Sequence, residues 1–226
     1  MSRTTDLLLT ALAPAIWGST YLVTTEALPD GYPVTLAVLR ALPAGLLLLA
    51  VTRCFPPRDW LGRTFILGAL NFSLFWVLLF VAAYRLPGGV AATLGSVQTL
   101  LVIAMARGWL GAPVRIGAVA AAVTGVAGVA LLLLGPEASL DPVGVAAGFG
   151  GAASMSAGTV LSRKWQPPVK ALSFAAWQLT AGGLILLPLA AIVYSITLYI
   201  PVMDEVTVQQ RKLLDERFFT GMTSLK

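Results

Sequence analysis

Residues 64–84 read TFILGALNFSLFWVLLFVAAY, an apolar stretch without a charged side chain. A helix needs about 20 such residues to cross the hydrocarbon core of a bilayer. The rest of the chain agrees, because 58% of its 226 residues are hydrophobic and only 11% are charged, whereas a soluble domain carries about 25% charged residues. This composition excludes an ordinary soluble fold, a disordered chain and a coiled coil. It predicts an all-α integral membrane protein.

Six further apolar segments, each bounded by charge or by proline and glycine, extend this pattern. Together they predict seven transmembrane helices: residues 7–27, 34–51, 64–84, 88–106, 116–135, 143–162 and 171–194. None of them shows the alternation of a transmembrane strand. The first segment, behind Arg3, is also similar to a secretory signal peptide. Since its apolar stretch continues to Leu22 and six spans follow, we interpret it as a retained helix.

The basic residues gather on one predicted side of the membrane. These are Arg3, Arg53, Arg58, Arg63, Arg107, Arg115, Arg163, Lys164 and Lys170. The other side carries Arg85 with Glu26, Asp30, Glu137 and Asp141. The positive-inside rule therefore predicts a multi-pass plasma or inner membrane protein with a cytoplasmic N-terminus. Nucleic acid is not an expected partner, because the basic residues form no continuous patch with interleaved aromatics.

Enzyme chemistry finds little support in the composition. The chain has one cysteine, Cys54, and no histidine, so zinc triads and Ser-His-Asp catalysis are excluded. We predict no catalytic residues, no metal site and no cofactor. A channel is the other alternative, but no charged or amide stripe marks a pore-lining ring.

An internal repeat is indicated at an offset of 138 residues. Ala37, Gly45, Leu46, Leu48 and Leu49 recur as Ala175, Gly183, Leu184, Leu186 and Leu187. Residues 17–22 are also weakly similar to residues 156–161. A repeat of five spans would insert its second copy upside down, and inverted repeats of this kind are typical of secondary transporters.

Small residues recur at four-residue spacing in two segments. One stripe is Gly117, Ala121 and Gly125, and the other is Gly144, Gly148, Ala152 and Ser156. Such stripes let helix backbones approach closely within a membrane. We interpret both as generic helix contacts, with dimerisation as the alternative.

Several short motifs resemble one known family when they are taken in chain order. They are residues 15–19 (AIWGS), Arg40, residues 82–84 (AAY), residues 86–92 (LPGGVAA) and residues 158–163 (GTVLSR). Over roughly residues 10–190 the chain resembles the EamA-type transporters of the drug/metabolite transporter superfamily. The resemblance implies two inverted five-helix repeats, ten helices in all, that export small metabolites such as amino-acid-like or amphipathic compounds.

On this resemblance, residues 7–135 form a complete five-helix repeat and residues 143–194 the first two helices of its inverted mate. The resemblance ends near residue 191, so the last three helices are missing. Residues 195–226 form an atypical polar tail, which we interpret as the product of a frameshift, an insertion or a truncation, with a native short form as the alternative. A second copy of the chain or another helix partner is the candidate replacement for the missing helices.

Arg40 is the sharpest candidate for a substrate-binding residue. It lies about two turns inside its span, where a buried cation costs roughly 2.5–3.5 kcal/mol. A charge at that depth normally faces a wet cavity, where it would attract a carboxylate. The alternative is a side chain that snorkels to the headgroups or pairs with Glu26.

The other candidates are aromatic and amide side chains inside the spans, which suit a small amphipathic substrate. They are Trp17, Tyr21, Asn71, Trp76, Gln98, Trp177 and Gln178. Packing or lipid contact is the alternative role for each aromatic. Gln178 is better placed, because the repeat makes it the counterpart of Arg40.

The sequence therefore predicts an exporter of small metabolites that works by alternating access within the lipid bilayer. No Asp or Glu lies deep in a predicted span, which disfavours proton coupling through a carboxylate. The alternative function is a truncated, transport-inactive fragment of such a transporter.

Overall fold

The computed structural model describes residues 11, 33–133 and 141–195. Apart from Ala11, the first predicted span lies outside the described residues, and so does the predicted tail apart from Ser195. The chain divides into two units, Met1–Leu187 and Pro188–Lys226. The described part consists of helices and their connections, with no strand among its residues, which confirms the all-α prediction.

The helices follow the predicted apolar segments closely. In chain order they are α2 (Pro33–Thr52), η1 (Arg58–Trp60), α3 (Leu61–Gly68), η2 (Ala69–Ser73), α4 (Leu74–Arg85), α5 (Gly88–Gly95), α6 (Val97–Leu110), α7 (Ile116–Leu133) and α8 (Pro142–Lys164). A last described helix, Ala171–Ser195, is called the 171–195 helix below. Only its final residues, from Pro188, belong to the second unit.

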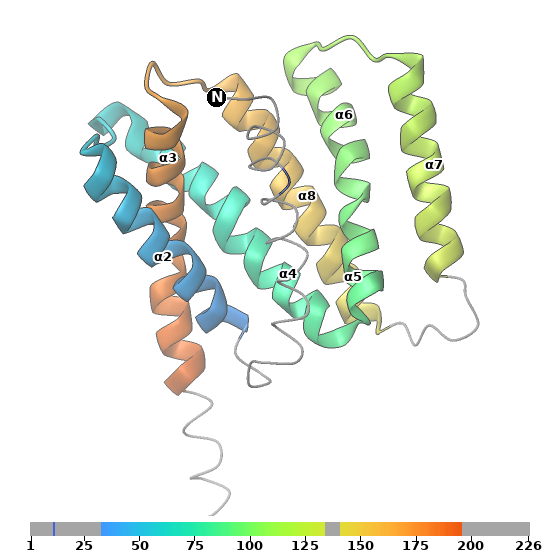
Figure 1. Cartoon of the computed structure of the whole chain (residues 1–226), viewed down its shortest axis with the longest axis horizontal. Coiled ribbons are helices and arrows are strands. Elements are labelled where there is room, and N and C mark those ends of the chain that lie inside the picture. Colours follow the sequence, from blue (N-terminus) through green and yellow to red (C-terminus); the bar gives the residue numbers. More distant parts are fainter. Residues whose placement is uncertain (1–10, 12–32, 134–140, 196–226) are drawn as a thin grey trace, which may run out of the picture. The chain divides into compact units, whose positions relative to one another are not determined.

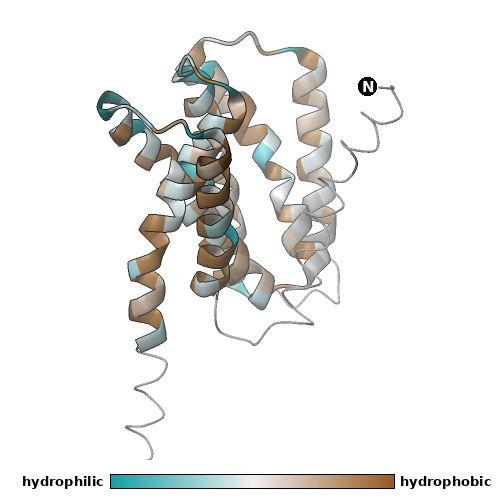
Figure 2. Cartoon of the chain, turned by 60° about the vertical axis from the view of Figure 1, so that its left-hand side comes forward, coloured by the Kyte–Doolittle hydropathy of each residue, from teal (hydrophilic) through white to brown (hydrophobic). Residues whose placement is uncertain are grey.

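Four helices of the described part are long and apolar enough to cross a membrane. They are Val34–Thr52, Arg58–Arg85, Pro142–Lys164 and Ala171–Ser195. Two further apolar helices, Val97–Leu110 and Ile116–Gly128, are shorter. Figure 2 shows hydrophobic residues along these helices and hydrophilic residues gathered at the connections between them.

Two predicted spans differ in detail from single straight helices. The segment 88–106 is broken at Ser96 into α5 and α6, and α6 runs on to Leu110. The segment 64–84 contains a π-helical turn, η2, between α3 and α4. Hydropathy detects neither feature, because both leave the apolar character of the segment unchanged.

The helix ends have local causes. Gly111 ends α6 with a φ of 65°, a left-handed conformation that glycine adopts without a Cβ penalty. Asp141 caps α8 by accepting a hydrogen bond from the Gly144 amide at 2.9 Å, with Pro142 in the first turn. The Asp141 carboxylate also pairs with the Arg85 guanidinium at 2.9 Å, which joins the end of α4 to the start of α8.

Helix α8 is the central packing element of the first unit, in contact with α4, α5, α6 and η2. A Cβ on Gly144 would lie 2.8 Å from Leu86, and a Cβ on Gly148 would lie 2.8 Å from Leu94. The predicted close packing of this stripe is therefore confirmed. At Gly117 and Gly125 a Cβ would meet nothing within 4 Å, so the stripe of α7 packs against no neighbour among the described residues.

The basic connections lie together. The segments after α2, after α6 and after α8 lie at the same end of the helices in Figure 1. The end of α4 and the start of α8, which the Arg85–Asp141 ion pair joins, lie at the opposite end. This is the arrangement that the charge pattern requires. The assignment of the basic end to the cytoplasm stays a prediction.

Candidate functional site

A π-helical turn places the first candidate side chain. Asn71 lies in the middle of η2 and is 7% exposed. Its Nδ2 donates to Gln178 Oε1 at 2.7 Å, and the same nitrogen lies 3.2 Å from Ser162 Oγ. Short π turns occur frequently at functional sites, because the extra residue redirects the side chains of the turn. Three elements, η2, α8 and the 171–195 helix, therefore meet at one amide.

Glycine at position 158 makes this meeting possible. A Cβ built on Gly158 of α8 would overlap Asn71 Oδ1 and would lie 2.6 Å from Asn71 Cγ. Non-bonded atoms do not come this close to a Cβ, so the amide occupies the space that a larger residue would need. The backbone of α8 is thus part of the wall around Asn71.

Hydroxyl groups satisfy backbone carbonyls at and beside the π turn. Ser154 Oγ donates to the Leu70 carbonyl at 2.7 Å, and Ser73 Oγ donates to the Gly182 carbonyl at 2.8 Å. A widened turn disturbs the regular ladder of helix hydrogen bonds, and neighbouring Ser side chains are a usual remedy within a membrane. The turn is therefore supported from both α8 and the 171–195 helix.

Arg40 and Trp76 form a second group of candidates. The guanidinium carbon of Arg40, on α2, lies 5.6 Å from the ring centroid of Trp76 on α4. Trp76 is 6% exposed and meets Phe72 edge to face, with ring centroids 5.4 Å apart. The Arg40 charge thus rests on an aromatic face, an attraction that strengthens when the pair is desolvated. Glu26, the alternative partner, lies outside the described residues.

The helices that carry Arg40 and Gln178 cross at reciprocal glycines. A Cβ on Gly45 would lie 2.6 Å from the Thr180 nitrogen, and a Cβ on Gly183 would lie 2.8 Å from Leu42 Cα. At the repeat offset of 138, Leu42 corresponds to Thr180 and Gly45 to Gly183. The contact between Gly45 and Thr180 and the contact between Gly183 and Leu42 are therefore equivalent under the repeat. Two equivalent contacts of this kind are the pattern of a local two-fold axis through an antiparallel crossing.

Trp177 and Gln98 lie elsewhere. Trp177 is 2% exposed, and its Nε1 donates to the Cys54 carbonyl at 2.6 Å. Its ring meets Phe174 edge to face at 6.4 Å. Gln98, on α6, is half-buried, and its backbone carbonyl accepts from Ser156 Oγ at 3.1 Å. Trp17 and Tyr21 lie outside the described residues.

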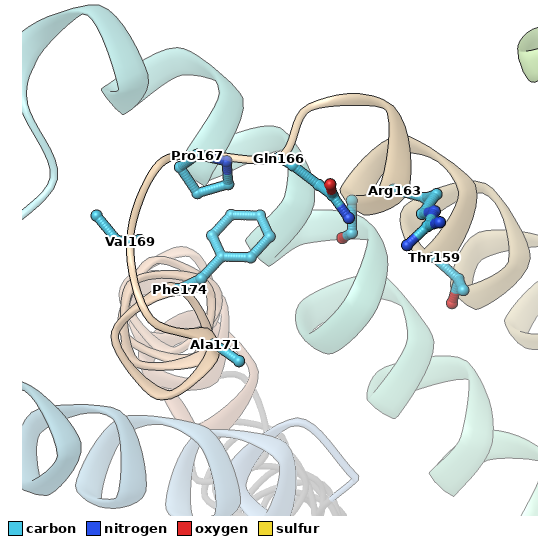
Figure 3. Close-up of a pocket in the computed structure, with 8 residues that line it drawn as sticks. Thr159, Arg163, Gln166, Pro167, Val169, Ala171 and Phe174 are labelled. Carbon is cyan, nitrogen blue, oxygen red and sulfur yellow. The ribbon is translucent and has the colours of Figure 1, made fainter.

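A pocket of about 510 Å³ opens where α8 is connected to the 171–195 helix (Figure 3), and its lining residue Ser162 contacts Asn71 of the amide pair. Thr159, Ser162 and Arg163 line it from the last turns of α8, Gln166 from the connection, and Phe174 from the 171–195 helix. None of these residues was among the predicted site residues. Ser162 and Arg163 nevertheless belong to the 158–163 motif, which could have indicated the pocket.

In the described part of the chain, no group of three or more His, Cys, Asp or Glu side chains lies close enough together to hold a metal ion. The arrangement offers instead two amides, hydroxyl groups and arginines within apolar helices. Such a set can bind a small polar molecule by hydrogen bonds.

Comparison with known proteins gives one family and two relatives. The model of the EamA-like transporter family matches residues 4–134. Protein PecM of Dickeya dadantii is 48% identical over 178 residues, which cover 78% of this chain and 60% of PecM. The uncharacterized transporter YvbV of Bacillus subtilis is 29% identical over 192 residues, which cover 83% of this chain and 63% of YvbV.

The chain thus spans about three fifths of the length of these curated relatives. No solved structure matches it.

Proposed function

Because this chain belongs to the EamA-like transporter family, we propose that it exports a small metabolite, amino-acid-like or amphipathic, by alternating access. The proposal depends chiefly on one observation, the buried hydrogen bond between Asn71 and Gln178. The binding site it assigns consists of this amide pair together with Arg40 and Trp76.

Two amides inside membrane-spanning helices call for a functional explanation. A polar group in the hydrocarbon region is costly unless it is paired, and polar residues there commonly mark a substrate pathway. Asn71 and Gln178 satisfy each other at 2.7 Å although 107 residues separate them. A substrate that carries amide, amino or carboxyl groups can replace this mutual bond with bonds of its own.

The reciprocal crossing of Gly45 and Gly183 supports the inverted-repeat arrangement, with residues 7–135 as the first repeat and residues 143–194 as part of the second. In transporters built this way the substrate lies near the midplane, at the interface of the repeats. Arg40 and Gln178 are counterparts under the same offset. The proposed site therefore uses equivalent positions from both repeats.

The test compares the compounds that accumulate outside cells expressing this chain with those outside cells carrying an empty vector, measured by mass spectrometry. The double variant Asn71→Leu/Gln178→Leu removes both partners of the buried hydrogen bond, so neither amide is left unpaired. We expect it to reduce export of the dependent compound about tenfold or more, since an unsatisfied polar group of the substrate costs about 1–3 kcal/mol. Arg40→Leu is expected to abolish export without loss of membrane insertion.

Thr124→Ala is the matched control, because among the described residues the Thr124 hydroxyl bonds only to the Ala120 carbonyl of its own helix. All variants are compared at equal amounts in the membrane fraction. Export by the amide double variant at the level of the parent chain would contradict the assigned site. If no compound depends on the parent chain, transport by this chain is itself refuted, and the inactive-fragment alternative stands.

A further inference from the structure

We infer that the pocket lined by Arg163 binds the anionic oxygen group of the transported molecule, and that the substrate is therefore a small organic acid. This inference rests on the proposed function and names its substrate class. It concerns a different part of the chain from the amide pair, the last turns of α8 and the start of the 171–195 helix.

The charge around the pocket is positive. Arg163 lines it and is solvent-exposed, and none of the lining residues carries a carboxylate. The described part of the chain holds two carboxylates, Asp59 and Asp141, of which Asp141 pairs with Arg85. No ion pair within 4.0 Å occupies Arg163 among the described residues. A guanidinium in this position offers a planar pair of donors that matches a carboxylate.

The remaining lining fits the rest of a small acid. Thr159, Ser162 and Gln166 contribute neutral hydrogen-bonding groups, and the ring of Phe174 provides an apolar wall (Figure 3). The volume of about 510 Å³ lies within the range of about 300–1,000 Å³ that is usual for small-molecule sites. An acid with a compact apolar body satisfies both kinds of surface.

Ser162 connects the pocket to the proposed transport site. Its hydroxyl lines the pocket and also lies 3.2 Å from Asn71 Nδ2, whose hydrogen bond to Gln178 is the centre of that site. A molecule held at its acid end by Arg163 is thus one side chain away from the amide pair. This continuity is what a loading position next to a transport site requires.

An anionic oxygen group at the end of a span has two sources, a free acid or the phosphate of an anionic lipid headgroup. The experiment therefore uses the full chain in nanodiscs of phosphatidylcholine, which carries no net charge. Calorimetry measures the binding of benzoate, phenylacetate and hexanoate, each against its uncharged amide. A second arm replaces part of the lipid with phosphatidylglycerol and measures lipid enrichment around the protein.

We expect the acids to bind more tightly than their amides. Arg163→Gln should weaken acid binding about tenfold or more, the effect of losing a hydrogen bond to a charged group, and leave amide binding unchanged. Arg163→Lys should retain part of the preference. Lys164→Gln is the control, an exposed neighbour with the same charge change that does not line the pocket, and should change affinity less than about twofold.

Equal losses in Arg163→Gln and Lys164→Gln, or no preference for the acids over the amides, would overturn the inference. So would lipid enrichment that Arg163→Gln abolishes while acid binding persists. Loss of acid binding in Arg163→Gln, together with normal export by Asn71→Leu/Gln178→Leu, would refute the proposed transport site but support the acid site. The two failures are therefore distinguishable.

Discussion

Replacing Gly158 with alanine tests the geometry of the amide cluster directly. The new Cβ would overlap Asn71 Oδ1 and would lie 2.6 Å from Asn71 Cγ. The Asn71 side chain must then leave its place, and its interactions with Gln178 and Ser162 are lost.

The magnitude follows from three contributions. Overpacking in a well-packed interior costs about 1–3 kcal/mol. Each interhelical hydrogen bond lost within a membrane costs about 0.6 kcal/mol, and Asn71 makes two. Alanine is better than glycine inside a helix by about 1 kcal/mol, which offsets part of the loss. We expect Gly158→Ala to lower the free energy of unfolding by about 2 kcal/mol.

The assay is reversible unfolding in mixed micelles, followed by tryptophan fluorescence. Gly117→Ala is the control, because a Cβ there meets no described residue within 4 Å and only the gain in helix propensity remains. A double-mutant cycle with Asn71→Ala gives the sharper result. Once the amide is removed the clash disappears, so Gly158→Ala should cost little in that background.

Two outcomes would refute the reasoning. One is a Gly158→Ala variant as stable as Gly117→Ala. The other is an undiminished cost of Gly158→Ala when Asn71 is already alanine. Either result would mean that the amide does not occupy the space above Gly158.

Two further predictions concern other contacts. Trp177→Phe keeps an aromatic ring but removes the 2.6 Å hydrogen bond to the Cys54 carbonyl, so it should destabilise the protein by about 1 kcal/mol in the same unfolding assay, whereas Trp109→Phe, at an exposed position, should change nothing. A hydrogen bond from the Gly144 amide, and then one from Arg85, lower the pKa of Asp141 in the folded protein. The carboxylate therefore stabilises the fold above its unfolded pKa of about 3.9. This stabilisation is lost as the pH falls through the lower pKa of the folded state. Asp141→Asn should remove this part of the loss of stability at low pH. If the melting temperature of the variant depends on pH as that of the parent chain does, in a series of thermal melts, the prediction is wrong.

Much of the fold could be predicted from the sequence because the bilayer imposes a length and a polarity on every span. Segments such as 64–84 and 171–194 were found with ends that differ by a few residues from the helices described. The stripe on α8 was also predictable, since four-residue spacing places small residues on one face. The break at Ser96 and the π turn were not, because apolar content does not report the hydrogen-bond register of a helix.

Four of the predicted candidates, Asn71, Gln178, Arg40 and Trp76, belong to the proposed site, but their pairings could not be predicted from the sequence. Asn71 and Gln178 were visible as polar residues within apolar runs, but their contact spans 107 residues and depends on how two helices are rotated. Trp177 and Gln178 show why contacts could not be predicted from position in the sequence. Neighbouring helix residues point about 100° apart, so one side chain contacts the Cys54 carbonyl while the other contacts Asn71.

The π turn at Ala69–Ser73 has a consequence for the α4 helix that follows it. One extra residue per turn shifts the phase of every later side chain by about 100°. Deleting a single residue within the turn would leave a span of adequate length and unchanged hydropathy. It would nevertheless rotate all 12 residues of α4 relative to α3, and replace the face that packs on α8 with one meant for lipid. Insertion into the bilayer constrains the length and hydropathy of this span, and both tolerate the deletion. Packing against neighbouring helices constrains the rotation of α4 about its axis, which does not tolerate it.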